Sequence, residues 1–306
     1  ILVESLALFI AGKVNIERYT KLIETEPNVK DLPEVEEVYG DCFEPKKENW
    51  EEFRGDIEFE HVDFRYPDGE EEVLKDFSLK IPFGTNLAIV GETGAGKSTL
   101  VNLMCRFYEP TGGRILVDGK DIKERSPLWM HSSLGYVLQT PHLFSGTVRD
   151  NLRYGKPDAS DEEIMEALKL VSADFVLEKM DKGLDSQVGE GGDMLSTGEK
   201  QLLSFARAIL ADPRILVLDE ATSSIDTLTE KVIQDAIDTV IRGRTSFVIA
   251  HRLSTVVDAD EILVVRDGKI IERGKHRELM NAKGYYYDLY TRQFAELAVN
   301  SVKMSN

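Results

Sequence analysis

Residues 91–99, with the sequence GETGAGKST, have the residue types and spacing of a phosphate-binding loop. Gly91, Gly96, Lys97 and Ser98 satisfy the pattern G-x-x-x-x-G-K-[ST]. In such a loop, glycines let the backbone curl so that amide groups point at phosphate oxygens, the lysine supplies a positive charge, and the serine hydroxyl can ligate Mg²⁺. An apolar run (LAIV) precedes the loop and a helix-forming run (TLVNLM) follows it. A glycine-rich turn with a chance lysine would not need these flanks, so we interpret the loop as a nucleotide site.

A pair of acids ends the apolar run RILVLDE, at Asp219 and Glu220. Asp219 could hold Mg²⁺ directly or through water, and Glu220 could polarise an attacking water. In an α/β sheet, ligands bind beyond the carboxyl ends of the strands, where the phosphate loop also leaves its strand. Taken alone, the pair would be an ordinary acidic strand end; beside a phosphate loop, it favours a hydrolytic site.

The stretch LSTGEKQ, residues 195–201, predicts the start of a helix. Ser196 and Glu199 fit the S-x-x-E capping box, in which the serine caps the helix and the glutamate reaches back to the cap amide. The apolar positions of LLSFARAIL would then form the buried face. A capped helix start with free amides also suits a phosphate group, so this stretch is a second candidate for nucleotide contact.

The elements around these stretches indicate an α/β domain. Apolar or alternating runs predict strands in GDIEFEHVDFRYP, VLKDFSLKI, LAIVG, RILVLDE, TSFVIA and EILVVRDGKIIERG. Helix-like segments alternate with the later runs, which favours a parallel sheet. The region from about Ile122 to Leu210 is predicted to be mainly helical, with one helix capped at Ser160 and Asp161. The aromatic run GYYYDLY is expected to pack in the core or against a partner.

The ends and the composition set further limits. The first residues predict a helix that stops near Pro27. Its apolar opening, ILVESLALFIAG, is too short to cross a bilayer and carries Glu4, so it could be the end of a membrane helix or of a core helix. Since the chain begins with isoleucine, we expect it to be a fragment or a processed chain. Residues 34–52 hold eight carboxylates against two lysines, which indicates a solvated linker. With a formal net charge of -18, nonspecific binding to nucleic acid is disfavoured. Cys42 and Cys105 have no metal-site spacing and are expected to be reduced thiols.

With these motifs in order, the chain resembles the nucleotide-binding domain of ATP-binding cassette (ABC) transporters, in particular the exporter branch, over about residues 55–289. Tyr66 in FRYP matches the aromatic residue that stacks on adenine in this family. Gln139 in YVLQTPHLFSGTVRDNL matches the glutamine that touches Mg²⁺ and senses the membrane domain. Glu190 in SQVGEGGDM matches the exporter-specific loop before the signature motif, LSTGEKQ. Further matches are SSID, with Ser224 and Asp226, at the dimer interface, and His251 in IAHRLST, which contacts the γ-phosphate.

The resemblance implies a P-loop NTPase (RecA-like) core with a parallel sheet, an N-terminal antiparallel β subdomain and a helical signature subdomain at about residues 137–205. It implies that residues 1–26 are the cytoplasmic end of the last transmembrane helix, residues 27–54 an acidic linker and residues 55–306 the ATPase domain. Glu220, His251 and Lys97 would be catalytic, and Mg²⁺ would be held by Ser98, Gln139 and Asp219. The expected ATP-binding residues are Tyr66, Gly91, Glu92, Thr93, Gly94, Ala95, Gly96, Lys97, Ser98, Thr99 and Gln139.

The implied partners are a second ABC ATPase domain and the transmembrane domain of the same transporter, at the cytoplasmic face of the cell membrane, with no nucleic acid. Two domains would pair head to tail, so that Ser196, Thr197, Gly198 and Glu199 meet the partner's ATP. The family usually has glycine where Thr197 stands and glutamine where Glu199 stands. Threonine tolerates few backbone conformations, and an unpaired glutamate would weaken the phosphate contact. An intact catalytic half with this altered signature favours one half of a heterodimer over a homodimer that tolerates Thr197.

Other functions stay open at this point. A soluble ABC-type ATPase acting on DNA or ribosomes would carry a coiled-coil insertion or a second ATPase domain, and neither is visible in the sequence. An importer ATPase subunit would lack the N-terminal membrane-linked helix. A GTPase is disfavoured because no N-K-x-D motif occurs. A regulatory cassette without activity would be expected to lack Glu220 or His251.

Overall fold

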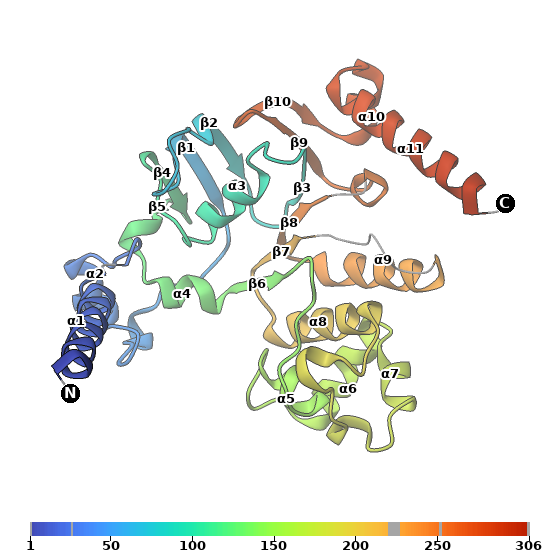
Figure 1. Ribbon diagram of the computed structural model, residues 1–306. Coiled ribbons are helices and arrows are strands. Elements are labelled where there is room, and N and C mark those ends of the chain that lie inside the picture. Colours follow the sequence, from blue (N-terminus) through green and yellow to red (C-terminus); the bar gives the residue numbers. More distant parts are fainter. Residues whose placement is uncertain (1, 26, 220–226, 251–252, 305–306) are drawn as a thin grey trace. The chain divides into compact units, whose positions relative to one another are not determined.

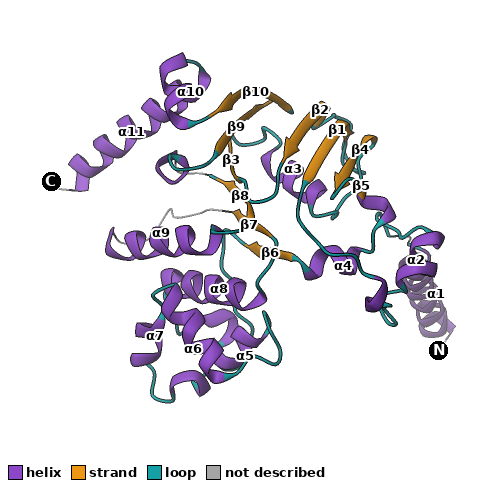
Figure 2. Cartoon of the chain, turned by 180° about the vertical axis from the view of Figure 1, so that it is seen from behind, coloured by secondary structure: helices purple, strands orange, loops and turns teal. Residues whose placement is uncertain are grey.

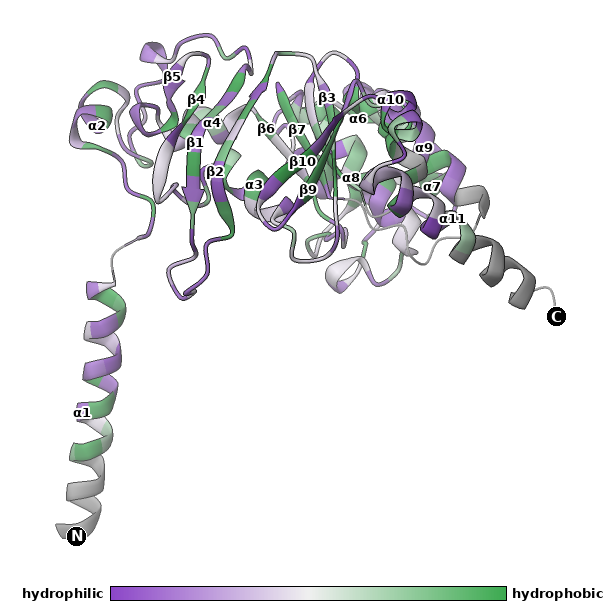
Figure 3. Ribbon diagram, turned by 90° about the horizontal axis from the view of Figure 1, so that it is seen from above, coloured by the Kyte–Doolittle hydropathy of each residue, from purple (hydrophilic) through white to green (hydrophobic). Residues whose placement is uncertain are grey.

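The computed structural model describes residues 2–25, 27–219, 227–250 and 253–304. The chain divides into two compact units, residues 1–30 and residues 31–306. The first unit consists of helix α1 (Leu2–Glu24), so the helix predicted to stop near Pro27 is confirmed. Hydrophobic and hydrophilic residues are mixed along α1 (Figure 3). Within the described ranges, no helix is both long and apolar enough to cross a membrane.

A four-stranded antiparallel sheet begins the second unit (Figure 1). Its order is β2-β1-β4-β5, from strands β1 (Ile57–Phe64), β2 (Leu74–Ile81), β4 (Gly112–Val117) and β5 (Lys120–Asp121). The predicted alternation of β1 holds, but the buried positions shift by one residue between Phe59 and Val62 because the strand bulges there. β4 and β5 were not predicted, since GGRILV is too short a run to show a clear period.

A six-stranded sheet forms the centre of the second unit, with the order β10-β9-β3-β8-β7-β6. Its strands are β3 (Asn86–Val90), β6 (Leu134–Val137), β7 (Ile215–Asp219), β8 (Thr245–Ile249), β9 (Glu261–Arg266) and β10 (Lys269–Gly274). All neighbours pair in parallel except β9 and β10, which form an antiparallel hairpin. The α/β class with a parallel core and an antiparallel β subdomain is therefore confirmed.

Helices pack against the central sheet in two groups (Figure 2). α3 (Lys97–Met104) lies between the two sheets, while α5 (Val148–Arg153), α6 (Asp161–Leu170), α7 (Asp174–Glu178) and α8 (Thr197–Ala211) gather in a helical layer. The remaining helices are α4 (Pro127–Ser132), α9 (Thr227–Ile241), α10 (His276–Ala282) and α11 (Tyr285–Met304). Short 3₁₀ turns stand at Lys47–Asn49, Ile122–Glu124, Gly183–Asp185, Glu190–Gly192 and Leu253–Val256.

Two hydrophobic cores result from this layering, and strand β3 serves both. Ala88 and Val90 belong to the core that the central sheet shares with the helical layer. Leu87 and Ile89 belong to the core between the two sheets, where α3 also packs. Because successive side chains of a strand point to opposite faces, an apolar run with no alternation is what a strand buried on both faces requires. Figure 3 shows the hydrophobic residues concentrated in the strands.

The helical region follows the sequence expectations closely. Ser160 caps α6, with its hydroxyl accepting the Glu163 amide while the Glu163 carboxylate accepts the Ser160 amide. Four helices lie between residues 148 and 211, in the region predicted to be mainly helical. Strand β6 was not predicted there, because LGYV is too short to be distinguished from helix.

The acidic segment before β1, expected to be a linker, contains the short helix α2 (Pro33–Tyr39), with Val35 and Tyr39 buried. Glu51 attaches this segment to the antiparallel sheet. Its carboxylate accepts hydrogen bonds from Tyr39 Oη (2.9 Å) and Lys120 Nζ (2.8 Å) and pairs with Arg125, and its carbonyl accepts Trp129 Nε1 (2.8 Å). Charge content suggested solvation, but the Glu51 carboxylate has two basic partners, Lys120 and Arg125, from a distant part of the chain.

Glu51 is expected to make the docking of this segment sensitive to acid. Burial alone would raise the pKa of Glu51, but the hydrogen bonds from Lys120 and Tyr39 and the charge of Arg125 lower it from 4.5 to about 2. A lowered pKa stabilises the folded state above pH 4.5, and this stabilisation is lost as the pH falls from 4.5 towards about 2. Its size is about 1 kcal/mol, because the side chain is exposed enough for solvent screening.

We predict that Glu51→Gln removes the part of the acid transition between about pH 4.5 and 2 that the fluorescence of Trp50 and Trp129 reports. Glu48→Gln is the matched control, because Glu48 is an exposed acid of the same segment. Identical titrations of the wild-type chain and Glu51→Gln would contradict the assignment.

Candidate functional site

The candidate site lies at the carboxyl edge of the central sheet. The pairing register sets Ile89 of β3 and Asp219 of β7 level with Ile249 of β8, which stands between these two strands. The phosphate loop after β3 and the acid that ends β7 therefore leave the sheet at the same edge. Glu220 and His251 follow β7 and β8 in the sequence, but they lie outside the described residues, as do Ser224 and Asp226.

The loop between β3 and α3 curls around the ammonium group of its own lysine. Lys97 Nζ donates hydrogen bonds to the carbonyl oxygens of Gly91 (2.8 Å) and Glu92 (2.9 Å). Gly94 and Gly96 have φ angles of 83° and 100°, a conformation that residues with a side chain rarely adopt. This backbone places the start of α3, with its unpaired amides, at the mouth of the loop.

The charge of Lys97 is held in a largely buried position. Burial lowers the pKa of Lys97 from its usual range, and the negative charge of Asp219, at the end of β7, opposes this shift. Asp219 also acts on Tyr136 of β6, whose pKa burial and this carboxylate raise to about 12. The phosphate loop and the acid that ends β7 thus lie at the same edge of the sheet, as a site for a phosphate and its metal ion requires.

The loop is fixed to the β9–β10 hairpin. A side-chain carbon at Gly91 would stand 2.2 Å from the carbonyl oxygen of Val265, so that position accepts glycine alone. The amide of Gly268 donates to the Ala95 carbonyl at 3.2 Å. By contrast, a side-chain carbon at Gly94 would meet no atom within 4 Å, which leaves the mouth of the loop open.

Tyr66, which the resemblance assigns to adenine, is connected to the first turn of α3. Its hydroxyl shares a hydrogen bond of 2.9 Å with Thr99 Oγ1. Its ring meets Phe64 and Tyr108 edge to face, at centroid distances of 4.9 and 5.1 Å. Tyr66 is partly exposed and Ser98 is exposed, whereas Thr99 is buried.

These residues fit a nucleoside triphosphate with Mg²⁺. The curled loop, the start of α3 and Lys97 supply amides and a positive charge for phosphate oxygens. No cluster of three or more His, Cys, Asp and Glu side chains that could hold a metal is found among the residues described. Mg²⁺ usually keeps several waters and binds through one or two carboxylates together with the substrate phosphates, so Asp219 and Ser98 are suitable residues to hold it here.

Gln139 is exposed in the loop that follows β6, beside an apolar groove. The groove has a volume of about 390 Å³. Leu138, Phe144 and Tyr154 are exposed there, and the rings of the last two stack at a centroid distance of 4.3 Å.

The predicted capping box at the start of α8 is confirmed. Ser196 Oγ accepts the Glu199 amide (3.3 Å), and Glu199 Oε2 accepts the Ser196 amide (2.9 Å). Thr197 is exposed and has the ordinary helical conformation of the first helical residue, so the expected conformational difficulty does not arise. Gly198 is buried. No hydrogen bond or ion pair in the described part of the chain joins residues 196–199 to residues 91–99.

The C-terminal helix contacts the loops of the site, which the sequence did not reveal. Gln293 Oε1 accepts the amide of Leu253 at 2.6 Å, two residues after His251. Arg292 lies 3.9 Å from the Glu92 carboxylate. In the aromatic run, Tyr286 is fully buried and its hydroxyl bonds His276 Nδ1 at 2.8 Å, so it packs in the core. Contacts over such sequence distances leave no local pattern.

Comparison with known proteins identifies the architecture. Residues 74–223 match the ABC transporter family. The chain belongs to the ABC transporter family. The family is one of ATPases that bind nucleotide, generally with Mg²⁺, so the predictions of the family and of an ATPase domain of the exporter type are confirmed.

Three related proteins illustrate the match. The chain is 50% identical over 240 residues to an uncharacterized ABC transporter ATP-binding protein, YfiC, of Bacillus subtilis (78% of this chain, 40% of that protein). It is 50% identical over 250 residues to YheH of the same organism, a probable multidrug resistance ABC transporter ATP-binding/permease protein (82% and 37%). A structure of a bacterial Atm1-family ABC exporter with ATP bound superposes with a TM-score of 0.80 at 37% identity (92% and 47%). The ABC ATPase domain thus spans less than half the length of these relatives.

We predict that Gly91→Ala weakens ATP binding, because its side-chain carbon would overlap the Val265 carbonyl and displace the loop. Local strain of about 1–3 kcal/mol corresponds to roughly 5- to 150-fold in Kd, measured by titration calorimetry. Gly119→Ala is the control: Gly119 also has a positive φ (78°), in the β4–β5 turn, but open space around it, and the change is expected to leave the Kd unchanged. Equal Kd values for Gly91→Ala and the wild-type chain would contradict the prediction.

Proposed function

We propose that this ABC ATPase domain binds MgATP at the loop of residues 91–99 and hydrolyses it to power export by a longer transporter. The observation that carries the proposal is the register that brings the phosphate loop, with Lys97, and Asp219 to one edge of the sheet, on either side of strand β8. A positive charge for phosphate and a carboxylate for the metal ion are the two groups that phosphoryl transfer from ATP needs in place.

Each residue has a role that its chemistry supports. Lys97 leaves its loop carbonyls to bind the β- and γ-phosphates, together with the amides at the start of α3. Tyr66, fixed edge-on by Phe64 and Tyr108, stacks on adenine. Ser98, Gln139 and Asp219 hold Mg²⁺, which neutralises the charge on the phosphate oxygens. Residues 92–95 and Thr99 complete the cradle.

The hydrolytic step depends on two residues that lie outside the described ranges. Glu220 orients the attacking water and accepts its proton, and His251 stabilises the charge of the γ-phosphate in the transition state. Both follow strands that end level with the phosphate loop, which supports their assignment. The Gln293 contact to Leu253 fixes the backbone shortly after His251.

The second half of each ATP site comes from a partner domain. In a head-to-tail dimer, Ser196 and the amides of Thr197, Gly198 and Glu199 meet the partner's γ-phosphate, while Ser224 and Asp226 lie at the interface. The exposure of Ser196 and Thr197 at the start of α8 supports this arrangement. Closing the dimer on ATP and reopening it after hydrolysis would switch the transporter between states.

A heterodimer remains the preferred assembly. Lys97 and the predicted Glu220 and His251 give a complete catalytic half, whereas Thr197 adds a methyl group at the phosphate-facing end of α8. Because Thr197 has a helical backbone conformation, its backbone is not strained, and the methyl group is the feature that would disturb phosphate binding. The partner would then carry the weaker catalytic half, and its ATP would be held by the altered signature of this chain.

The transmembrane domain is proposed to join the chain at the cytoplasmic face through residues 1–26. Apolar side chains along α1, such as Phe9, Ile16 and Leu22, are exposed in the described chain, as they would be at the end of a helix that continues into a helical bundle. The groove beside Gln139, with Phe144 and Tyr154 exposed, is a suitable second contact. The exporter-type relatives favour this reading over an ATPase subunit without a membrane domain.

We predict that Glu220→Gln leaves ATP binding intact and lowers the rate of phosphate release about 100-fold or more, because the amide cannot accept a proton from water. The measurement is the ATPase rate and ATP Kd of the full-length transporter. Glu162→Gln, at an exposed acid of α6, is the control with a normal rate. A normal rate for Glu220→Gln, where this chain supplies the sole competent site, would refute its catalytic assignment.

The partner can be identified by purifying the full-length protein and determining every chain that accompanies it. We expect a second, different ABC chain in equal amount, with an unfavourable residue at the position of its catalytic glutamate. A transporter made of this chain alone, with two equally active sites, would contradict the heterodimer.

A further inference from the structure

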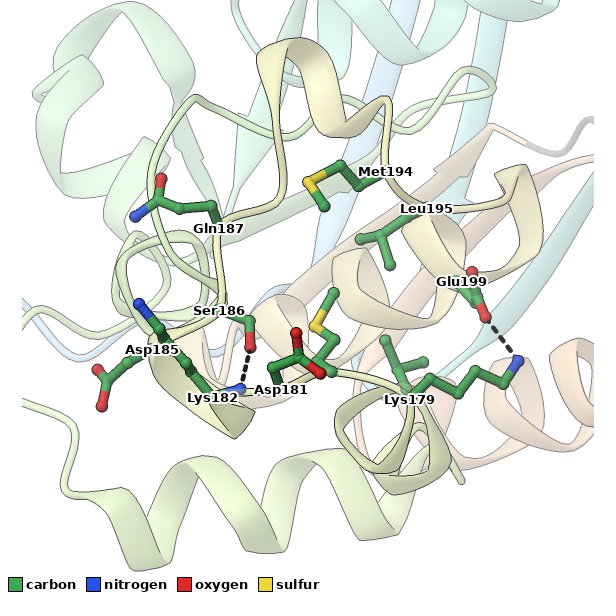
Figure 4. A pocket seen from close by; sticks show the side chains of 11 residues that line it. Lys179, Asp181, Lys182, Asp185, Ser186, Gln187, Met194, Leu195 and Glu199 are labelled. Atoms are coloured by element: carbon green, nitrogen blue, oxygen red, sulfur yellow. Dashed lines mark hydrogen bonds and ion pairs between the residues drawn. The ribbon is translucent and has the colours of Figure 1, made fainter.

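The carboxylate of Glu199 is divided between two donors in the first turn of α8. Glu199 Oε2 accepts the Ser196 amide at 2.9 Å, and Glu199 Oε1 accepts Lys179 Nζ, also at 2.9 Å (Figure 4). The Glu199 side chain is 14% exposed and that of Lys179 is 64% exposed. Burial would raise the pKa of Glu199, but the bonds from Lys179 and Ser196 outweigh it and lower the pKa. Glu199 is therefore a charged residue at the start of the signature helix.

Lys179 is placed for this contact by the helix before it. It is the C-cap residue that follows α7, and its ammonium group lies 4.9 Å from the ring centroid of Phe175. The pair borders a groove of about 410 Å³ whose apolar lining includes Val176 and Met194. A second lysine, Lys182, lines the same groove, but no ion pair from it to Glu199 is found in the described chain.

The capping box itself does not need a charge at position 199. Glutamine can accept the N-cap amide with its side-chain oxygen as glutamate does. Glutamate adds a negative charge in the first turn, where the amides of α8 are the groups expected to meet a phosphate. Lys179, bonded to the Glu199 carboxylate, returns the local net charge to zero. A glutamine at position 199 would be neutral without a lysine.

We propose that Lys179 is a positioning residue of the signature, which neutralises Glu199 so that the start of α8 can bind the γ-phosphate of a partner domain's ATP. This inference rests on the function proposed above. It assigns to α7 a part in nucleotide binding, through one side chain that does not touch the nucleotide. It also means that Glu199 is not by itself a defect of the signature, so that Thr197 alone separates this helix start from a favourable one.

The proposal predicts changes of opposite sign for the two halves of the pair. Lys179→Met keeps the apolar stem and leaves a net charge of −1, Glu199→Gln leaves +1, and the double variant leaves zero. The full-length transporter, with Glu220→Gln to prevent turnover, is titrated with MgATP while closure of its two ATPase domains is followed by the distance between one label on each. We expect the half-saturating ATP concentration to rise about two- to fivefold for Lys179→Met, as for an exposed ion pair, and to fall for Glu199→Gln.

The double variant Lys179→Met/Glu199→Gln should return to the starting value, and Lys179→Arg should stay near it. Lys182→Met is the matched control, since it removes a positive charge from the same groove without breaking a contact to Glu199. Its effect is expected to be smaller than that of Lys179→Met, because solvent screens the more distant charge.

A purely structural ion pair would give a different result. Breaking it from either side would then weaken closure and lower Tm in both single variants, and the double variant would not recover. That pattern, or an unchanged ATP dependence in Lys179→Met, would overturn the proposal. Absence of ATP-driven closure in the starting transporter would instead refute the proposed function and the inference with it, so the two failures are distinguishable.

Discussion

The parallel pairing of β3, β8 and β7 is the constraint on which the rest of the site depends. It sets Ile89, Ile249 and Asp219 level and brings three sequence-distant segments to one edge of the sheet. The position of Asp219 follows from this register, since a shift of one residue in the β7–β8 pairing would turn its side chain to the other face of the sheet. The β9–β10 hairpin then fixes the loop from the other side, through Val265 and Gly268.

Sequence reasoning reached much of the site because its motifs carry their own geometry. A glycine-rich loop between an apolar run and a helix is a strand–loop–helix unit, and an S-x-x-E stretch is a capped helix start. Each of these signals is contained within a short stretch of the chain. Buried parallel strands such as β3 and β7 were predicted for the same reason. These local patterns sufficed for the fold class and for the capping box of Ser196 and Glu199.

What the sequence could not reveal are contacts between distant segments. The acids of residues 34–52 indicated a solvated linker, yet Glu51 is bound by Lys120 and Arg125, whose positions depend on the turn at β5. The ion pair of Lys179 with Glu199 spans 20 residues across the end of α7. Charge counts therefore described the segments correctly but missed their partners, because pairing depends on the tertiary fold. Strands β4 and β6 were not predicted for a simpler reason, which is that each is short.

Strand β3 has a mechanical consequence for the domain. Its five residues are clamped from both faces, with Ala88 and Val90 in one core and Leu87 and Ile89 in the other. Displacing the strand would require both cores to repack at once, since close-packed interiors are stiff. The strand that precedes the phosphate loop is therefore held in a fixed position when a ligand binds. Any conformational change on ligand binding therefore falls on the surrounding loops and the helical layer. The central sheet is then the rigid part of the domain relative to which these elements move.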